Sequence, residues 1–336
     1  MLIPVGGHPL HTRSLTMKVT ALGEERWSAS GQVIDLRKTG FAPLSTGLQP
    51  AGIIHHMCLD LRVHAPTLRI EALQAAQPVV AIEPSERSCG ESCRDPVGRL
   101  DALVGDVLDD QFRARLSAAF GGPRGCSHLL ALFQFMARAL PRLVASQAQV
   151  GVESPHGVGE AVFQSALFID GHYTEQREFE LCLQLSDFLV RPEQHVAAAL
   201  ERYQYERALR LHTIVEPPAM QLRDSSAALR ERTLESLHDA RFDERPQWAA
   251  ALDGRAMMQG LSSGIAARFA QDGEDGFFVD AIAQLAPGFI QVLAAVADQW
   301  IARTRSGEDA VQDRPLGGGV DSCYIWREGG GVSRQG

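Results

Sequence analysis

Hydrophobic and polar residues alternate along much of the first eighty positions, which is the pattern of strands that bury one face. The alternation runs through residues 14–22, 26–37, 55–63 and 67–75, with a turn between the members of each pair. Two hairpins in succession predict a small antiparallel sheet. Residues 83–99 are rich in polar and turn-forming residues, so we expect a loop there.

Further along, the apolar residues take a helical spacing. Residues 100–120 are predicted to be helical, and a Gly-Gly-Pro break follows them. Residues 127–145 then place a row of apolar side chains on one helical face: Leu129, Leu132, Phe133, Met136 and Leu140. Glycine, proline and polar residues at 150–160 indicate a linker.

The second half of the sequence predicts one more hairpin, followed by helices. Residues 161–171 and 178–190 form the hairpin, and helical stretches are expected at 193–212, 224–239, 247–270 and 277–304. The sequence thus predicts an α+β fold with a small antiparallel sheet and helices in its N-terminal half. The C-terminal half is expected to be mainly helical. We assign residues 1–150 to an α+β domain, 151–310 to a hairpin plus helical domain, and 311–336 to a Gly-rich tail.

Composition excludes several classes of protein. The 336 residues are 45% hydrophobic with a net charge of -9, so they can form a large core but lack the basic face that nucleic-acid binding requires. No Walker A loop and no G-x-G-x-x-G fingerprint is present, and we therefore expect no organic cofactor. The partner predicted by this composition is a small-molecule substrate.

Cysteine content and apolar runs bear on the cellular compartment. The start of the chain lacks the basic and apolar segments of a signal peptide, and polar residues and a proline interrupt the longest apolar stretch, 281–302. That stretch is predicted to be a core helix and not a membrane span. The six cysteines do not suggest a disulfide scaffold, so we expect reduced thiols in the cytoplasm. The apolar helices of the second half also suggest a homodimer.

Cys126 and His128 lie where a Gly-rich turn gives way to the predicted helix at 127–145. The free N–H groups of a helix start favour a thiolate, which can attack carbonyl carbon or bind a metal. The alternative is an ordinary helix start with Ser127 as the N-cap. Cys89 and Cys93 would complete a zinc shell with this pair, but their C-x3-C spacing is loose and we expect no metal.

Two further groups of residues have candidate chemistry. In 55–63 one strand face carries His55 and Met57, while the other carries a polar row that includes Arg62, which is expected to be solvated. In the second half, Tyr173, Arg177 and Tyr205 have side chains that can hold a phenolic or carboxylate ligand. They are also ordinary half-buried residues, which is the interpretation we favour.

The N-terminal half resembles a bacterial family of domains of unknown function over about residues 10–145. The resemblance rests on Gly125, Cys126, His128 and Leu129, with Ser127 where the family has threonine. It rests also on the strand residues His55, Met57 and Leu59, on Asp35 and Arg13, and on a loop cysteine, Cys93 or Cys89. It implies that Arg13, Asp35, His55, Cys126 and His128 form one cluster, but it implies no activity.

These residues support a cofactor-independent acid–base enzyme, a lyase or isomerase acting on a small aromatic anion. An example is the retro-aldol release of formaldehyde from a lignin-derived phenol. His55 would be the base and Asp35 its orienting group, with Arg13 or Arg62 holding a carboxylate and Cys126 and His128 polarising the site.

Two alternatives remain. One is a transferase or hydrolase with Cys126 as the nucleophile. The other is a non-enzymatic ligand-binding or assembly module. An enzyme should bury His55 or His128 in a pocket with a second ionisable group, whereas a binding module should leave both histidines on open surface.

Overall fold

The computed structural model describes residues 5–23, 25–44, 46–151, 155–269, 273–305 and 319–333. Its centre is one nine-stranded sheet in the order β11-β10-β9-β8-β7-β1-β2-β5-β6, in which all neighbouring strands are antiparallel. The strands are β1 His8–Gly23, β2 Arg26–Arg37, β5 Gly52–His64, β6 Arg69–Val79, β7 Ala161–Tyr173, β8 Phe179–Val190, β9 Tyr203–Glu216, β10 Gln221–Arg232 and β11 Asp243–Glu244. A small hairpin, β3 Ala42–Leu44 and β4 Gly47–Gln49, stands apart from the sheet.

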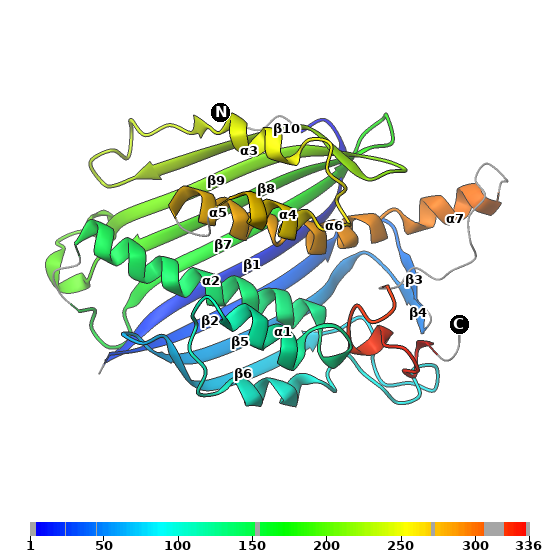
Figure 1. The fold of residues 1–336 in the computed structure, drawn as a ribbon, viewed down its shortest axis with the longest axis horizontal. Helices are drawn as coiled ribbons and strands as arrows, with labels where there is room; N and C mark the ends of the chain where they lie inside the picture. The colour runs from blue at the N-terminus through cyan, green and yellow to red at the C-terminus, as the bar shows by residue number, and fades with distance from the viewer. Residues whose placement is uncertain are drawn as a thin grey trace.

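Helices cover one face of this sheet (Figure 1). They are α1 Phe112–Phe120, α2 Ser127–Val150, α3 Pro246–Leu252, α4 Leu261–Arg268, α5 Gly273–Ile282 and α6 Leu285–Ala294. Helix α7 Ala297–Arg305 projects past the end of the sheet near β3. Short 3-10 turns occupy Val97–Leu103, Gly122–Arg124, Glu193–His195, Ala199–Arg202 and Tyr324–Trp326. Residues 319–333 lie at the end of the sheet where β3 and β4 project.

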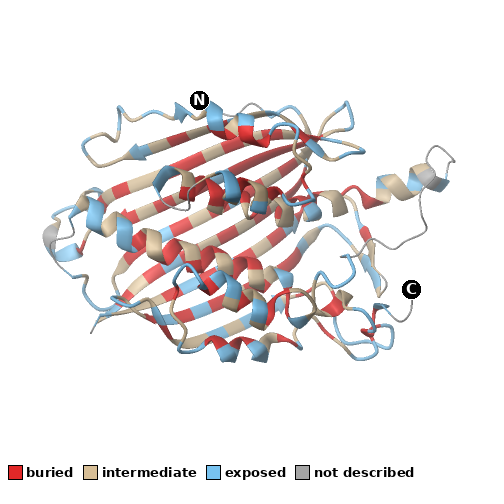
Figure 2. Cartoon of the chain, in the orientation of Figure 1, coloured by how far each residue is buried: buried red, intermediate tan, exposed pale blue. Residues whose placement is uncertain are grey.

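Odd-numbered residues of the strands face the helical layer and form the core, except before the register irregularities of β6 and β10, where Ile70 and Leu222 take the buried positions. Buried positions therefore alternate along each strand, as Figure 2 shows by colour. The helices approach closely where the sheet offers glycine: a Cβ at Gly31 would lie 2.4 Å from Met136 Sδ of α2. At Gly171 a Cβ would lie 2.2 Å from a methyl group of Val292 on α6, so both glycines are required by packing.

The prediction of a mainly helical C-terminal half is wrong. Residues predicted as helices at 193–212 and 224–239 form most of β9 and β10, which pair with each other and extend the sheet beyond the 161–190 hairpin. The N-terminal sheet is not small either, because β1 pairs with β7 and joins both halves. The α+β class itself holds, and helices do occur within 247–270 and 277–304.

Two apolar segments are long enough to cross a membrane by length and composition alone, Ser127–Val150 and Gly273–Ala294. About half of each is buried inside the protein, 50% and 56% of the most apolar window. Both segments bury their apolar residues in the core against the sheet, as helices of a globular core do.

Candidate functional site

The site begins with a row of three side chains across three neighbouring strands. Antiparallel register places Arg13 of β1 opposite Asp35 of β2, and Asp35 opposite His55 of β5. All three are odd-numbered and face the helical layer, where they are almost completely buried. His11 and Arg37 form a second opposed pair two residues along the same strands. The alternation of strand side chains thus gathers five ionisable groups on one inner surface.

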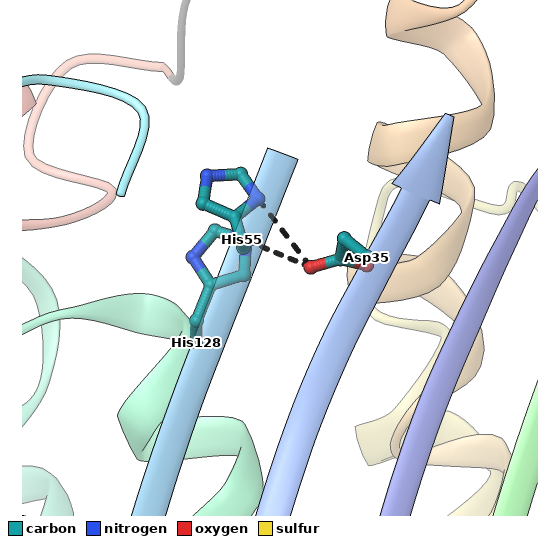
Figure 3. A group of neighbouring side chains, drawn as sticks. All are labelled: Asp35, His55 and His128. Atoms are coloured by element: carbon teal, nitrogen blue, oxygen red, sulfur yellow. Dashed lines mark ion pairs between the residues drawn. The ribbon is translucent and has the colours of Figure 1, made fainter. Parts of the chain in front are cut away.

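The first turn of α2 supplies the next group, His128. The helix begins at Ser127 with Cys126 as its N-cap residue, so the predicted helix start is confirmed. The His128 ring lies over the His55 ring with centroids 3.7 Å apart, so the start of α2 reaches the sheet at His55. His128 Nε2 and His55 Nδ1 each lie 3.4 Å from Asp35 Oδ2 (Figure 3).

Asp35 is the centre of this cluster and has no exposed surface. Its Oδ1 accepts from His11 Nε2 at 3.2 Å, and Arg13 Nη1 lies 3.3 and 3.2 Å from Oδ1 and Oδ2. Burial alone would raise the pKa of Asp35, but the Arg13 charge and the His11 hydrogen bond outweigh burial and hold it well below its usual value. Asp35 is therefore an ionised carboxylate inside the protein.

The histidines respond to burial in the opposite sense. Burial, with the neighbouring His55, holds the pKa of His128 well below its usual value. Burial also lowers the pKa of His11, although Asp35 partly offsets the effect. Both imidazoles are neutral at pH 7.

A cavity of about 480 Å³ opens above this cluster. Its polar floor contains Arg13, Arg37, His55 and His128, and its walls are mainly apolar, from the β3–β4 hairpin, α2 and α6. The remaining wall is formed by residues 319–326, including Tyr324 and Trp326. Residues 319–333, where the sequence predicts a Gly-rich tail, are thus part of the site.

The structure brings together Arg13, Asp35, His55, Cys126 and His128, the five residues that the resemblance groups. Cys126 lines the cavity, and its Sγ accepts a hydrogen bond from Gln77 Nε2 at 3.5 Å. Burial raises the pKa of the Cys126 thiol to about 11, so it stays protonated and is a poor nucleophile. This disfavours a Cys126-dependent transferase or hydrolase.

The other predicted substrate-binding residues lie elsewhere. Arg62 points from the outer face of β5 and pairs with Glu71 at 3.6 Å. Tyr173 packs on Phe179 at the C-terminal end of β7 and does not line the cavity, and Arg177 lies in the turn before β8. The side chain of Tyr205 is buried in β9, away from the cavity lining.

Ligand-type side chains converge at one place in the described ranges. Asp35, His55 and His128 place one ligand atom each within 4.8 Å of one another. The alternative zinc set of Cys89, Cys93, Cys126 and His128 does not meet that criterion. All six cysteines are free thiols.

Sequence reasoning missed His11, Arg37 and the aromatic wall of the cavity. His11 and Arg37 carry a usable signal, because each lies two residues from a predicted site residue on the same strand face. Tyr324 and Trp326 carry none, because they reach the site through long-range packing. Gln291 of α6, whose Nε2 lies 3.3 Å from His128 Nε2, was missed for the same reason.

Fold and site together define an antiparallel α+β protein whose buried histidine–aspartate–arginine centre opens into an apolar cavity. Within it, residues 11–141 match the model of a family described as a protein of unknown function (DUF2889). The match confirms that a domain of unknown function covers this part of the chain, as the resemblance implies. It includes Arg13, Asp35, His55 and His128 but neither α6 nor residues 319–333. Neither the curated proteins nor the solved structures contain a match.

Proposed function

We propose that this protein is an enzyme, a carbon–carbon lyase or isomerase that acts by proton transfer on a small aromatic anion. One observation carries the proposal: Asp35, His55, His128 and Arg13 converge on the floor of an otherwise apolar cavity. A buried histidine beside a second ionisable group is what an enzyme requires, and a binding module has no need of it. The volume of about 480 Å³ suits a small molecule.

The charges at the floor favour an anionic substrate. Arg37 is 2% exposed, and its described hydrogen bonds go to the neutral oxygens of Gln49, at 2.6 Å to the main chain and 3.1 Å to the side chain. The Nε atoms of Arg13 and Arg37 are buried without a hydrogen-bond partner in the described part of the chain. Asp35 pairs directly with Arg13, and Arg37 has the Asp298 and Asp35 carboxylates near it without a direct ion pair in the described residues. Both guanidinium groups line the cavity, where a carboxylate or phenolate could pair with them.

The walls favour an aromatic body. The rings of Tyr324 and Trp326 and the side chains of Leu44, Ile82 and Ile290 line the cavity above the charged floor. An aromatic ring would be buried against these side chains while its anionic group reaches the arginines.

A retro-aldol cleavage illustrates the chemistry. A base removes the proton of a hydroxymethyl group, the bond from its carbon to the next carbon breaks, and formaldehyde leaves. The electron pair of that bond passes into a conjugated acceptor, and the resulting carbanion takes up a proton. The floor must supply a proton acceptor and positive charge for the developing anion, and the imidazoles and Arg13 are placed to do so. In the isomerase variant the proton returns elsewhere and no bond to carbon breaks.

We further propose that the protein works in the cytoplasm, supported by its free thiols, and as a homodimer.

The test is a screen of the purified protein against lignin-derived phenolic dimers, with released aldehyde as the measured product. His128→Asn should lower turnover at least about tenfold, equivalent to about 1.4 kcal/mol of barrier. His56→Asn is the matched control, because His56 is on the outer face of β5 and contacts Gln32. No turnover across the panel, or equal turnover in the wild type and His128→Asn, would count against the proposal.

A further inference from the structure

We propose that Asp35, His55 and His128 bind one zinc-like divalent metal ion, with a fourth coordination position open to the cavity. The inference deepens the proposed function, since it adds an electrophile to that site, but the binding itself can be tested without any substrate.

The spacing of the three ligand atoms carries the proposal. Zinc bonds to imidazole nitrogen and carboxylate oxygen are about 2.0–2.2 Å long, so neighbouring corners of a tetrahedral shell are about 3.4 Å apart. His55 Nδ1 and His128 Nε2 each lie 3.4 Å from Asp35 Oδ2. An octahedral shell with the same bonds would need ligand atoms about 3.0 Å apart. Both distances to Asp35 Oδ2 match the tetrahedral shell, and the two histidine nitrogens lie within 4.8 Å of each other.

The same distances are poor for hydrogen bonds, which rarely exceed about 3.2 Å between nitrogen and oxygen. His55 Nδ1 is buried, and in the described ranges it has no hydrogen-bond partner. A buried nitrogen without a partner costs free energy, and a cation between His55 and Asp35 would remove that cost. The structure thus has an unsatisfied ligand atom aimed at the proposed ion.

Hydrogen bonds from neighbouring side chains also fix the orientation of the Asp35 carboxylate, as is usual for a metal ligand. Its Oδ1 accepts from His11 at 3.2 Å, and Arg13 Nη1 lies 3.3 Å from Oδ1 and 3.2 Å from Oδ2, so these contacts fix the carboxylate with Oδ2 also facing the two histidines. Outer contacts of this kind fix the orientation of a ligand and are typical of metal sites. The three ligands come from β2, β5 and α2, and packing of the helix on the sheet sets their separation.

The fourth position would face the cavity, which His55 and His128 both line. Gln291 Nε2 lies 3.3 Å from His128 Nε2, and a bound ion would take over that lone pair. The Gln291 amide would then be free to donate to a water molecule or substrate oxygen at the open position. The ion would act as a Lewis acid on a substrate oxygen where negative charge develops.

This proposal departs from the expectation that the protein uses no metal. That expectation rested on the loose C-x3-C spacing of thiols in one loop. The ligands proposed here are far apart in sequence and meet only through strand register and helix docking.

The test uses the full chain after removal of metal by a chelator. Calorimetric titration with zinc should give one ion per chain, and zinc should raise the thermal midpoint. Cobalt(II) should give the strong visible absorption of tetrahedral coordination. His55→Ala and His128→Ala should each lower zinc affinity by more than about a hundredfold, beyond the loss usual for an outer contact. His128 is at a helix start beside the cavity, so its variant keeps the test valid if His55→Ala does not fold.

His56→Ala is the matched control. His56 Nε2 lies 3.5 Å from Cys58 Sγ on the outer face of β5, the sort of pair that binds stray zinc. Unchanged stoichiometry in His56→Ala would exclude that pair as the source of the signal. No binding to the wild type, or unchanged affinity in both His55→Ala and His128→Ala, would overturn the metal proposal.

Activity separates the two proposals. Turnover by the metal-free protein in chelator would refute the role of the ion as an electrophile and leave the lyase or isomerase intact, while the zinc titration alone decides whether the ion binds. One zinc bound at Asp35, His55 and His128, with no turnover on any substrate in the panel, would refute only the proposed function.

Discussion

Asp35 and Arg13 form an ion pair in which both side chains are buried. Charged side chains are almost never fully buried unless they are paired, so this pair is a distinctive feature of the site. A buried ion pair adds little net stability because desolvation offsets the attraction between its charges. Removing one partner is different, because the remaining charge then has no compensation. Asp35 is thus both the centre of the site and a point of vulnerability for the fold.

Asp35→Asn should therefore destabilise the metal-free protein by about 3–5 kcal/mol, because it leaves the Arg13 guanidinium buried and unpaired. Urea denaturation in chelator measures this loss without any contribution from a bound ion. Asp60→Asn, on the exposed face of β5, should change stability by less than about 0.5 kcal/mol. The double variant Asp35→Asn with Arg13→Met should recover part of the loss. A single variant as stable as the wild type would contradict the account.

At this scale the sequence predicts the clustered residues better than the side chains that support them. Arg13, Asp35, His55 and His128 follow from strand alternation and from the resemblance to the family. Arg62 lies on the opposite face of β5 from His55, as the alternation in 55–63 predicts, and so lies outside the cluster. The register that sets Arg13 against Asp35 and Asp35 against His55 depends on hairpin turns and on an irregularity beside Asp35, which residue alternation does not encode.

Among the elements, β9 shows why the helix prediction failed. Tyr205, Leu209 and His212 fit a helical face, and the arginines, glutamates and alanines around them favour helices intrinsically. In the fold, Tyr203, Tyr205, Leu209, Leu211 and Val215 form a buried row of period two. Pairing with β8 on one side and β10 on the other overrode the local propensity.

Residues 319–333 owe their position to a few contacts. Glu91 pairs with Arg327, and its Oε2 accepts a hydrogen bond from Gly331 N at 2.9 Å. Tyr324 N donates to Gly125 O at 2.8 Å, and Ile325 is buried against Ile82. The wall of the cavity therefore depends on a carboxylate, Glu91, that lies outside the cluster around Asp35.

Glu91→Ala should loosen this segment and weaken substrate retention while leaving the metal ligands untouched. Amide hydrogen exchange within 319–333 should speed up, and KM should rise several-fold with kcat and zinc stoichiometry unchanged. Arg87→Ala, an exposed change in the same loop, is the control. Unaltered exchange in Glu91→Ala would mean that apolar packing alone holds the segment.

In the whole molecule, the two halves share one core. The buried cluster runs from Leu10 of β1 to Val296 beyond α6, and β1 pairs with β7 along almost its full length. Arg142 of α2 donates to Asp187 of β8 at 2.7 Å and to Asp280 of α5 at 2.6 Å. These bonds connect α2, a helix of the N-terminal half, to the C-terminal half. The boundary assigned at residue 150 coincides with the end of α2. The pairing of β1 with β7 crosses that boundary, and local sequence patterns cannot predict a pairing between strands some 150 residues apart.

A shared core predicts a single cooperative unfolding transition for the metal-free protein. Trp27, packed against the core in β2, reports on the first half, and Trp248, buried and stacked on Phe278 at 4.8 Å, reports on the second. Two variants isolate these probes, one that keeps only Trp27 and one that keeps only Trp248, with the other three of the four tryptophans changed to phenylalanine. For each variant in urea, the curve from fluorescence and the curve from far-ultraviolet circular dichroism should coincide.

Arg142→Met should move the whole transition to lower urea, because it leaves Asp187 and Asp280 buried without their shared cation. Arg113→Met, an exposed change in α1, is the control. Two separated transitions, one followed by each tryptophan, would show that the halves fold independently. A shift confined to one probe in Arg142→Met would locate the boundary between them at the contact of α2 with β8 and α5.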